Sequence, residues 1–242
     1  MLGLIDRIYT YFRIRNKPEK IEVIPKIIKG SDNKEVSFYF VPSVVSSSHL
    51  GNGIIRMGEN SIIHTIPSRE LVHEDPAETV NNLQRIYNPA ADLMQEYISQ
   101  GYRINLIGVS LGNVLTIRAA SEVVKWQLNK LVSIAGGYRL GNSAWQSILT
   151  RDIVRKNCSS AEVYEEGVKA FSPATYVSRI KAEELYFRIG THDLLIPSSE
   201  GRALMGALRN KVFKTDIKCY LGASHGTSIY LASRDLREKN KV

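Results

Sequence analysis

A serine flanked by glycines is the first feature of this sequence that could do chemistry. The motif GVSLG (108–112) lies between a predicted buried strand and a helix expected to start at Leu111. Small neighbours allow the sharp strand-to-helix turn that exposes a nucleophilic Ser110, and the first N–H groups of the helix would face developing negative charge. Capping of the helix by Ser110 is the alternative, but it does not account for Gly108 and Gly112.

A serine hydroxyl needs a base and an acid to become a nucleophile at neutral pH. His225 lies in the small-residue loop GASHG (222–226), directly after the last predicted strand. Asp193 lies in the turn GTHDLLIP (190–197), after the strand before that one. A carboxylate there would fix the imidazole tautomer and stabilise the imidazolium. A purely structural role for Asp193, in the turn or as a helix cap, stays open.

The order serine, aspartate, histidine along the chain is the order of the α/β-hydrolases. GVSLG resembles the nucleophile elbow of that superfamily, GTHDLLIP its acid loop and GASHG its histidine loop; SPATYV (172–177) is similar to the segment before the acid strand in esterase- and lipase-like members. The resemblance covers about residues 20–235. It implies a catalytic triad of Ser110, His225 and Asp193 that cleaves a carboxylic ester or related acyl substrate through an acyl-enzyme.

The expected oxyanion hole departs from the family pattern. Many relatives have His-Gly after the strand that precedes the oxyanion loop, whereas this chain has FVPSV (40–44). The resemblance gives the backbone N–H groups of Leu111 and Val44 as donors, with Val45 as the competitor for the second position. Because both donors are backbone groups, the side-chain change does not forbid the hole.

Seven segments have the composition of strands, and most of them alternate with helical patterns. The expected strands are residues 20–29, 36–41, 61–66, 104–108, 130–135, 184–189 and 215–221. A helix is expected from Asp75-Pro76, with a helical pattern that resumes after Pro89 and runs to about Gln100. The alternation predicts an α/β fold with a mainly parallel, doubly wound sheet that has helices on both faces.

The domain prediction is one α/β-hydrolase domain over residues 20–242, preceded by an amphipathic segment at 1–19. Residues of about 138–177 interrupt the alternation and are expected to form a small helical cap. Its apolar side chains would either line a hydrophobic substrate pocket or pack against the core. These side chains are Tyr138, Trp145, Ile148, Leu149, Ile153, Val154 and Phe171.

Composition limits the partners of the chain. The 242 residues are 43% hydrophobic and 23% charged, which is typical of a globular domain. The net charge is +8, but basic residues are densest near the two termini and no nucleic-acid motif accompanies them, so no nucleic-acid partner is expected. Cys158 and Cys219 have no metal or redox spacing. We therefore expect free thiols, a cytoplasmic location, and no metal or organic cofactor; a disulfide between the two stays open.

Leu2, Ile5, Tyr9 and Phe12 recur at helical spacing in the amphipathic segment. Charges at Asp6 and Arg7 come too early for a signal-peptide core. Such a helix would pack against the domain or a second copy, or make weak contact with a membrane surface. The oligomeric state stays open.

Two other functions fit the same sequence. An acyltransferase or a peptidase would use the same triad with another acceptor or an amide substrate. The alternative that is not an enzyme is a non-catalytic binding protein of the same fold, and it is disfavoured because all three triad members are present. Dehalogenases and epoxide hydrolases of the superfamily use an aspartate in the place of Ser110.

Overall fold

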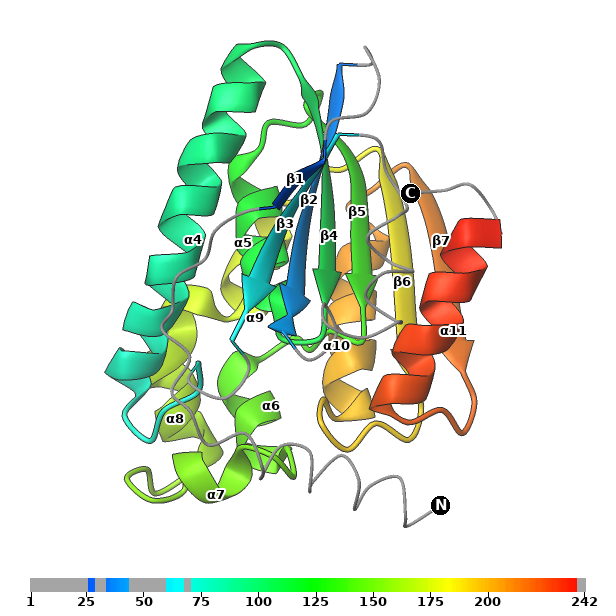
Figure 1. Ribbon diagram of the computed structural model, residues 1–242. Helices are drawn as coiled ribbons and strands as arrows, with labels where there is room; N and C mark the ends of the chain where they lie inside the picture. The colour runs from blue at the N-terminus through cyan, green and yellow to red at the C-terminus, as the bar shows by residue number, and fades with distance from the viewer. Residues whose placement is uncertain (1–25, 29–33, 44–59, 68–70, 239–242) are drawn as a thin grey trace.

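A twisted sheet of seven strands forms the centre of the molecule. The computed structural model describes residues 26–28, 34–43, 60–67 and 71–238. The strand order is β1-β3-β2-β4-β5-β6-β7; β1 pairs antiparallel with β3, and all other neighbours are parallel (Figure 1). The strands are β1 (Lys26–Ile28), β2 (Glu35–Pro42), β3 (Ser61–Ile66), β4 (Arg103–Val109), β5 (Leu128–Ile134), β6 (Glu184–Gly190) and β7 (Lys214–Tyr220).

Alternating residues of the strands serve two separate hydrophobic layers. Phe38, Leu106 and Leu131 belong to the larger layer, which also contains buried residues of α4 (Pro76–Ser99), α5 (Gly112–Glu122) and α10 (Ser198–Arg209). The next residue of each strand faces the other layer, which is covered by α11 (His225–Glu238). Successive residues of a strand face opposite sides of the sheet, and both sides are covered by helices. The predicted doubly wound α/β fold is thereby confirmed.

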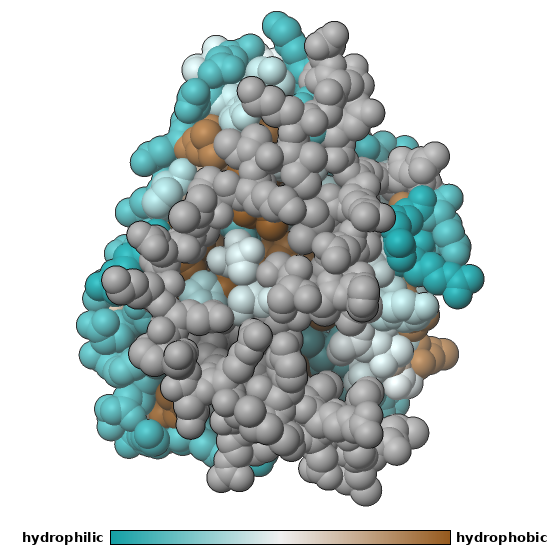
Figure 2. Space-filling view, in the orientation of Figure 1, coloured by the Kyte–Doolittle hydropathy of each residue, from teal (hydrophilic) through white to brown (hydrophobic). Residues whose placement is uncertain are grey.

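The sequence prediction was wrong at Pro89, where α4 does not break. The helix begins as expected, with the Asp75 side chain accepting a hydrogen bond from the Ala77 N–H and Pro76 at its first position. It then runs without interruption to Ser99, although Pro89 has no N–H to donate to the preceding turn. Tyr87 and Ala90, on either side of the proline, are buried in the core, and this packing offsets the missing bond. The outer side of α4 is hydrophilic (Figure 2).

The segment between β5 and β6 contains short helices at the carboxyl ends of the strands (Figure 1). Val154 and Phe171 are fully buried in the larger layer, while Tyr138 and Trp145 pack against its edge. These contacts are the core packing that the sequence offered as one alternative for the apolar residues of this segment. The helices are α6 (Leu140–Gln146), α7 (Arg151–Val154), α8 (Ala161–Val168), η1 (Lys169–Phe171), α9 (Pro173–Tyr176) and η2 (Val177–Arg179).

A buried ion cluster connects α11 to the sheet. The Arg188 side chain on β6 is 0% exposed, and its Nε and Nη2 lie 2.9 and 2.7 Å from Asp235 Oδ2 on α11. Its Nη2 lies 3.2 Å from Asp216 Oδ1 on β7, and its Nη1 donates to the Asp216 carbonyl at 2.6 Å. Lys218 contacts the other oxygen of Asp235. Since arginine stays charged in proteins, the two carboxylates are what make its burial possible.

His64 is a neutral core residue and not a second candidate base. It is 1% exposed on β3, and its ring is nearly parallel to those of Phe38 and Phe40, with centroids 6.1 and 5.3 Å away. Neither ring nitrogen has a hydrogen-bond partner within the described part of the chain. Because burial penalises the charged form, the pKa of His64 is lowered to about 4.

We expect His64 to weaken the fold as the pH falls from about 6.5 to about 4. Within this range the unfolded chain binds a proton at His64 and the folded chain does not, so acid favours unfolding. The loss between pH 7 and pH 5 is about 2 kcal/mol of unfolding free energy. Urea unfolding at pH 7 and pH 5 measures the loss of unfolding free energy. In His64→Leu this loss should be smaller than in the unaltered chain by about the same amount. Equal losses in both chains would contradict a neutral His64.

Candidate active site

Ser110 occupies a sharp turn at the carboxyl end of the central strand β4. Its φ is 54°, which places a residue with a side chain in the left-handed region. The Ser110 N–H donates to the Ile134 carbonyl of β5 at 2.8 Å. The Asn113 amide donates to the Ser110 carbonyl at 3.0 Å and to the same Ile134 carbonyl at 2.9 Å, which adds a second tie between the turn and β5. Asn113 could not be identified from the sequence, because it carries no recognisable signal apart from its place three residues after Ser110.

Both glycines beside Ser110 are required by space. A Cβ on Gly112 would lie 1.9 Å from the Phe40 carbonyl oxygen, and one on Gly108 would lie 2.5 Å from Thr116 Oγ1. Helix α5 therefore packs so closely against β2 and β4 that neither of these two positions has room for a side chain. In addition, α5 has no side-chain cap, so Ser110 does not have the capping role that the sequence left as an alternative.

His225 reaches Ser110 from the first residue of α11. Its Nε2 lies 2.8 Å from Ser110 Oγ, although 115 positions separate the two residues in the chain. Its Nδ1 lies 2.6 Å from Asp193 Oδ2, and the His225 side chain is 11% exposed. The structure thus brings together the three side chains that the sequence singled out, at hydrogen-bond distances.

Asp193 has both carboxylate oxygens engaged. Oδ1 accepts the backbone N–H groups of Leu195 and Ile196, both at 2.9 Å, and Oδ2 faces His225. The side chain is 3% exposed. Three polar contacts compensate for the burial of the carboxylate and fix its orientation. Asp193 is thus part of the turn and also a partner of His225.

The contacts determine the tautomer of His225. An ionised carboxylate only accepts hydrogen bonds, so the proton of the neutral ring lies on Nδ1, which donates to Asp193. Nε2 is then an acceptor, and the Ser110 hydroxyl donates to it. This arrangement can take a proton from the hydroxyl while the carboxylate stabilises the imidazolium that forms.

Of the expected oxyanion donors, Leu111 lies within the described residues. Leu111 follows Ser110 directly, and its N–H lies at the N-terminus of α5, where the first N–H groups of a helix have no partner within it. Val44 and its competitor Val45 lie outside the described residues. Leu111 adjoins Ser110 in the chain, and both oxyanion donors stay predictions.

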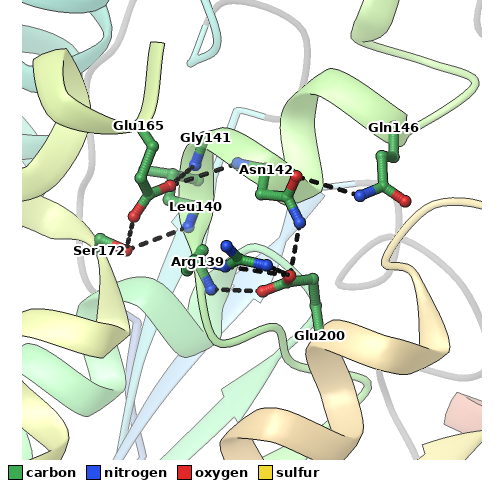
Figure 3. Close-up of polar contacts among 8 residues, drawn as sticks. All are labelled: Arg139, Leu140, Gly141, Asn142, Gln146, Glu165, Ser172 and Glu200. Atoms are coloured by element: carbon green, nitrogen blue, oxygen red, sulfur yellow. Dashed lines mark hydrogen bonds and ion pairs between the residues drawn. The ribbon is translucent and has the colours of Figure 1, made fainter. Parts of the chain in front are cut away.

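Two carboxylates, the buried Glu200 and the half-buried Glu165, fix the start of the inserted segment beside this site (Figure 3). Glu200 on α10 accepts hydrogen bonds from the Arg139 backbone and guanidinium at 2.7–3.2 Å and from the Asn142 amide at 2.5 Å. The Glu200 side chain is 2% exposed, while that of Arg139 is 50% exposed. The segment that follows β5 is thereby tied to α10.

Glu165 provides the second anchor. Its Oε2 accepts the N–H groups of Gly141 and Asn142 at 2.5 and 3.3 Å, and its Oε1 accepts the Ser172 hydroxyl. Ser172 Oγ in turn accepts the Leu140 N–H at 3.2 Å. The first turn of α6 is thus capped by side chains from later in the chain. The Ile148 N–H also donates to the carbonyl of Leu194, beside Asp193, at 3.2 Å, which joins this segment to the acid loop.

Metal sites and membrane-spanning helices do not occur among the described residues. No group of three or more His, Cys, Asp or Glu side chains there could hold a metal ion. Within the same ranges, no helix is both long and apolar enough to cross a bilayer. Cys158 and Cys219 are free thiols, as expected.

No model of a known protein family matches the sequence, and no curated protein matches it.

Solved structures of similar fold are numerous. A lipase-esterase related protein from Clostridium acetobutylicum has a TM-score of 0.55 and 13% identity, over 91% of this chain and 99% of that one. A monoacylglycerol lipase from Paleococcus ferrophilus has a TM-score of 0.55 and 16% identity, over 91% and 97%. An acylaminoacyl peptidase from Pyrococcus horikoshii has a TM-score of 0.57 and 14% identity over 96% of this chain, which spans 42% of the peptidase. Identities this low show a shared fold alone.

Proposed function

We propose that this chain, whose fold is that of the α/β-hydrolases, is a serine hydrolase that cleaves carboxylic esters or related acyl compounds. One observation carries the proposal, namely the continuous hydrogen-bonded line from Ser110 through His225 to Asp193. Each of the three residues follows a different strand, namely β4, β6 and β7. The similarity in fold to esterases and lipases supports the same conclusion.

The reaction begins with attack of Ser110 Oγ on the substrate carbonyl carbon. Nε2 of His225 takes the hydroxyl proton, and Asp193 stabilises the imidazolium. The carbonyl oxygen becomes an oxyanion, to which the Leu111 N–H and a second backbone N–H, from Val44 or Val45, donate. Collapse of this intermediate breaks the ester bond, and His225 gives its proton to the departing alcohol.

Water completes the cycle. His225 takes a proton from the water as the water oxygen attacks the acyl carbon, and a second tetrahedral intermediate forms. Its collapse breaks the bond to Oγ, returns the proton to Ser110 and releases the carboxylic acid. Apart from the substrate and water, every group used in these steps belongs to the chain.

Cleavage of an amide is the second candidate activity, and the similarity in fold to the acylaminoacyl peptidase favours it. The triad would act in the same way, with an amine as the leaving group. Parallel assays with an ester and an amide of the same acyl group would separate the two activities.

A fluorophosphonate probe tests the proposal. We expect the probe to label Ser110, located by mass spectrometry, because the base activates that hydroxyl alone. Labelling should be lost in His225→Ala, which removes the base. His192→Ala is the matched control, since His192 is exposed, adjoins Asp193 and has its Nδ1 3.1 Å from Thr191 Oγ1. Folded protein that resists the probe, or labelling that survives in His225→Ala, would refute the proposal.

A further inference from the structure

We propose that the loops at the amino ends of β5 and β7 bind the surface of a membrane that contains anionic lipids. The contact would be made by an edge patch, which consists of Val124, Lys125, Trp126 and Phe213. The first three lie in the loop between α5 and β5, and Phe213 lies in the loop between α10 and β7. The proposal is independent of the hydrolase activity.

The edge patch exposes an unusual amount of apolar surface. Val124, Trp126 and Phe213 are 50%, 67% and 75% exposed. Lys125 Nζ lies 4.4 Å from the centroid of the Phe213 ring, so the two loops lie side by side. Large side chains held together at loop tips can enter the headgroup region of a bilayer as a unit, and tryptophan is the residue most typical of that region.

Positive charge surrounds these side chains. Lys181 is exposed in the loop that precedes β6, Arg209 is exposed at the end of α10, and Lys211 is exposed in the loop that precedes β7. Within the described part of the chain, neither these three residues nor Lys125 forms an ion pair. The nearby acidic residues are already neutralised, since Glu183 lies 2.6 Å from Arg103 and Glu184 lies 2.7 Å from Lys214. The remaining charge complements anionic headgroups, each contact strengthening binding about fivefold.

A lipid surface fits the edge patch better than a protein or a nucleic acid. Lysine is depleted from protein–protein interfaces, whereas it surrounds this patch. Nucleic acids are bound by stacking of bases on the faces of aromatic rings. One face of Phe213 is already covered by the ammonium group of Lys125. Apolar tips with a basic rim are the arrangement that bilayer surfaces favour.

The orientation of the docked molecule follows from the sheet. Because β4 to β7 are parallel, the edge patch precedes the strands and Ser110 follows them, at opposite ends of the sheet (Figure 1). A membrane bound at the edge patch would therefore leave Ser110 facing the aqueous phase. It would hold the protein at a surface without supplying substrate from the bilayer.

Sedimentation of the full chain with vesicles tests the proposal. We expect binding to vesicles of phosphatidylglycerol mixed with phosphatidylcholine, and much weaker binding to phosphatidylcholine alone. Trp126→Ser should weaken the partition into anionic vesicles about tenfold, and Trp126→Ser with Phe213→Ser should abolish it. In Trp145→Phe, where Trp126 is the sole tryptophan, the fluorescence should shift to the blue on binding, as the indole leaves water.

Leu221→Ser is the matched control, since Leu221 is 89% exposed and follows β7 at the opposite end of the sheet. It should bind vesicles as the unaltered chain does. Equal binding by the double variant would overturn the proposal and point to another surface, such as the amphipathic segment at 1–19. Two further results would overturn it: no sedimentation of the folded chain with anionic vesicles, or binding to single-stranded nucleic acid in place of vesicles.

Discussion

Replacing Ser110 by alanine is expected to abolish the turnover of ester substrates and leave the fold intact. The substitution removes a single oxygen, the one that lies 2.8 Å from His225 Nε2. Alanine meets the same backbone strain at φ 54° as serine does, so folding should not change. From other serine hydrolases, the loss in kcat should be on the order of 10⁴- to 10⁶-fold. Initial rates with p-nitrophenyl esters measure it, and circular dichroism checks the fold.

The control for this experiment is Ser121→Ala on the same region of the chain. The Ser121 hydroxyl donates to the Arg118 carbonyl within α5 and does not contact the triad. Full activity is expected there. The assignment of Ser110 as the nucleophile fails if Ser110→Ala retains more than about one hundredth of the original rate, because general binding effects leave far less.

Removal of Asp235 should strongly destabilise the fold. Asp235→Ala leaves Arg188 fully buried, still charged, and with Asp216 as its remaining carboxylate partner. Loss of one partner of a buried ion pair costs about 3–5 kcal/mol of unfolding free energy. Because Asp216 remains, we expect a value of about 3 kcal/mol. Urea unfolding measures this loss. Activity should fall as well, since α11 carries His225 at its first residue.

An exposed ion pair on the same helix provides the comparison. Arg234 and Glu238 lie 2.8 Å apart, and their side chains are 64% and 62% exposed. Glu238→Ala should cost far less than Asp235→Ala, since solvent screens such pairs. If both substitutions cost the same, Arg188 is not held by Asp235 in the way the distances indicate.

The ion pair also has a pH dependence. Burial raises the pKa of Asp235, but hydrogen bonds from Lys218 and Arg188 outweigh this effect, so the pKa lies below its ordinary value. The contribution of Asp235 to stability is therefore complete above the ordinary aspartate pKa of about 4, and it is lost as the pH falls through the lower value of the folded state.

Most of the fold follows from local patterns in the sequence. The strands around residues 104–108 and 184–189 are buried apolar runs bounded by turn residues, and β4 and β6 extend them by only one or two residues. The helix at Asp75 has a capping aspartate and a proline at its first position. Such signals act within a few residues, and for this reason they can be found in one sequence. Ser110, Asp193 and His225 could be identified from the sequence because each lies in a motif that follows a predicted strand.

The parts that sequence did not predict depend on contacts between distant segments. Pro89 suggests a break, but the burial of Tyr87 and Ala90 against the core keeps α4 continuous. Glu200 and Arg139 are far apart in the chain, and nothing near either residue indicates the pair. Arg188 did carry a signal, since a charged residue within the apolar strand at 184–189 requires a buried partner. Its partners, Asp216 and Asp235, could not be named without the fold.

The left-handed backbone at Ser110 lowers the stability of the fold but is needed to present the nucleophile. A residue with a Cβ in this conformation costs about 1–2 kcal/mol, whereas glycine adopts it freely. A glycine in place of Ser110 would relieve that strain and remove the hydroxyl. Mutation towards greater thermal resistance would therefore favour loss of the serine, and only a requirement for its chemistry opposes that drift.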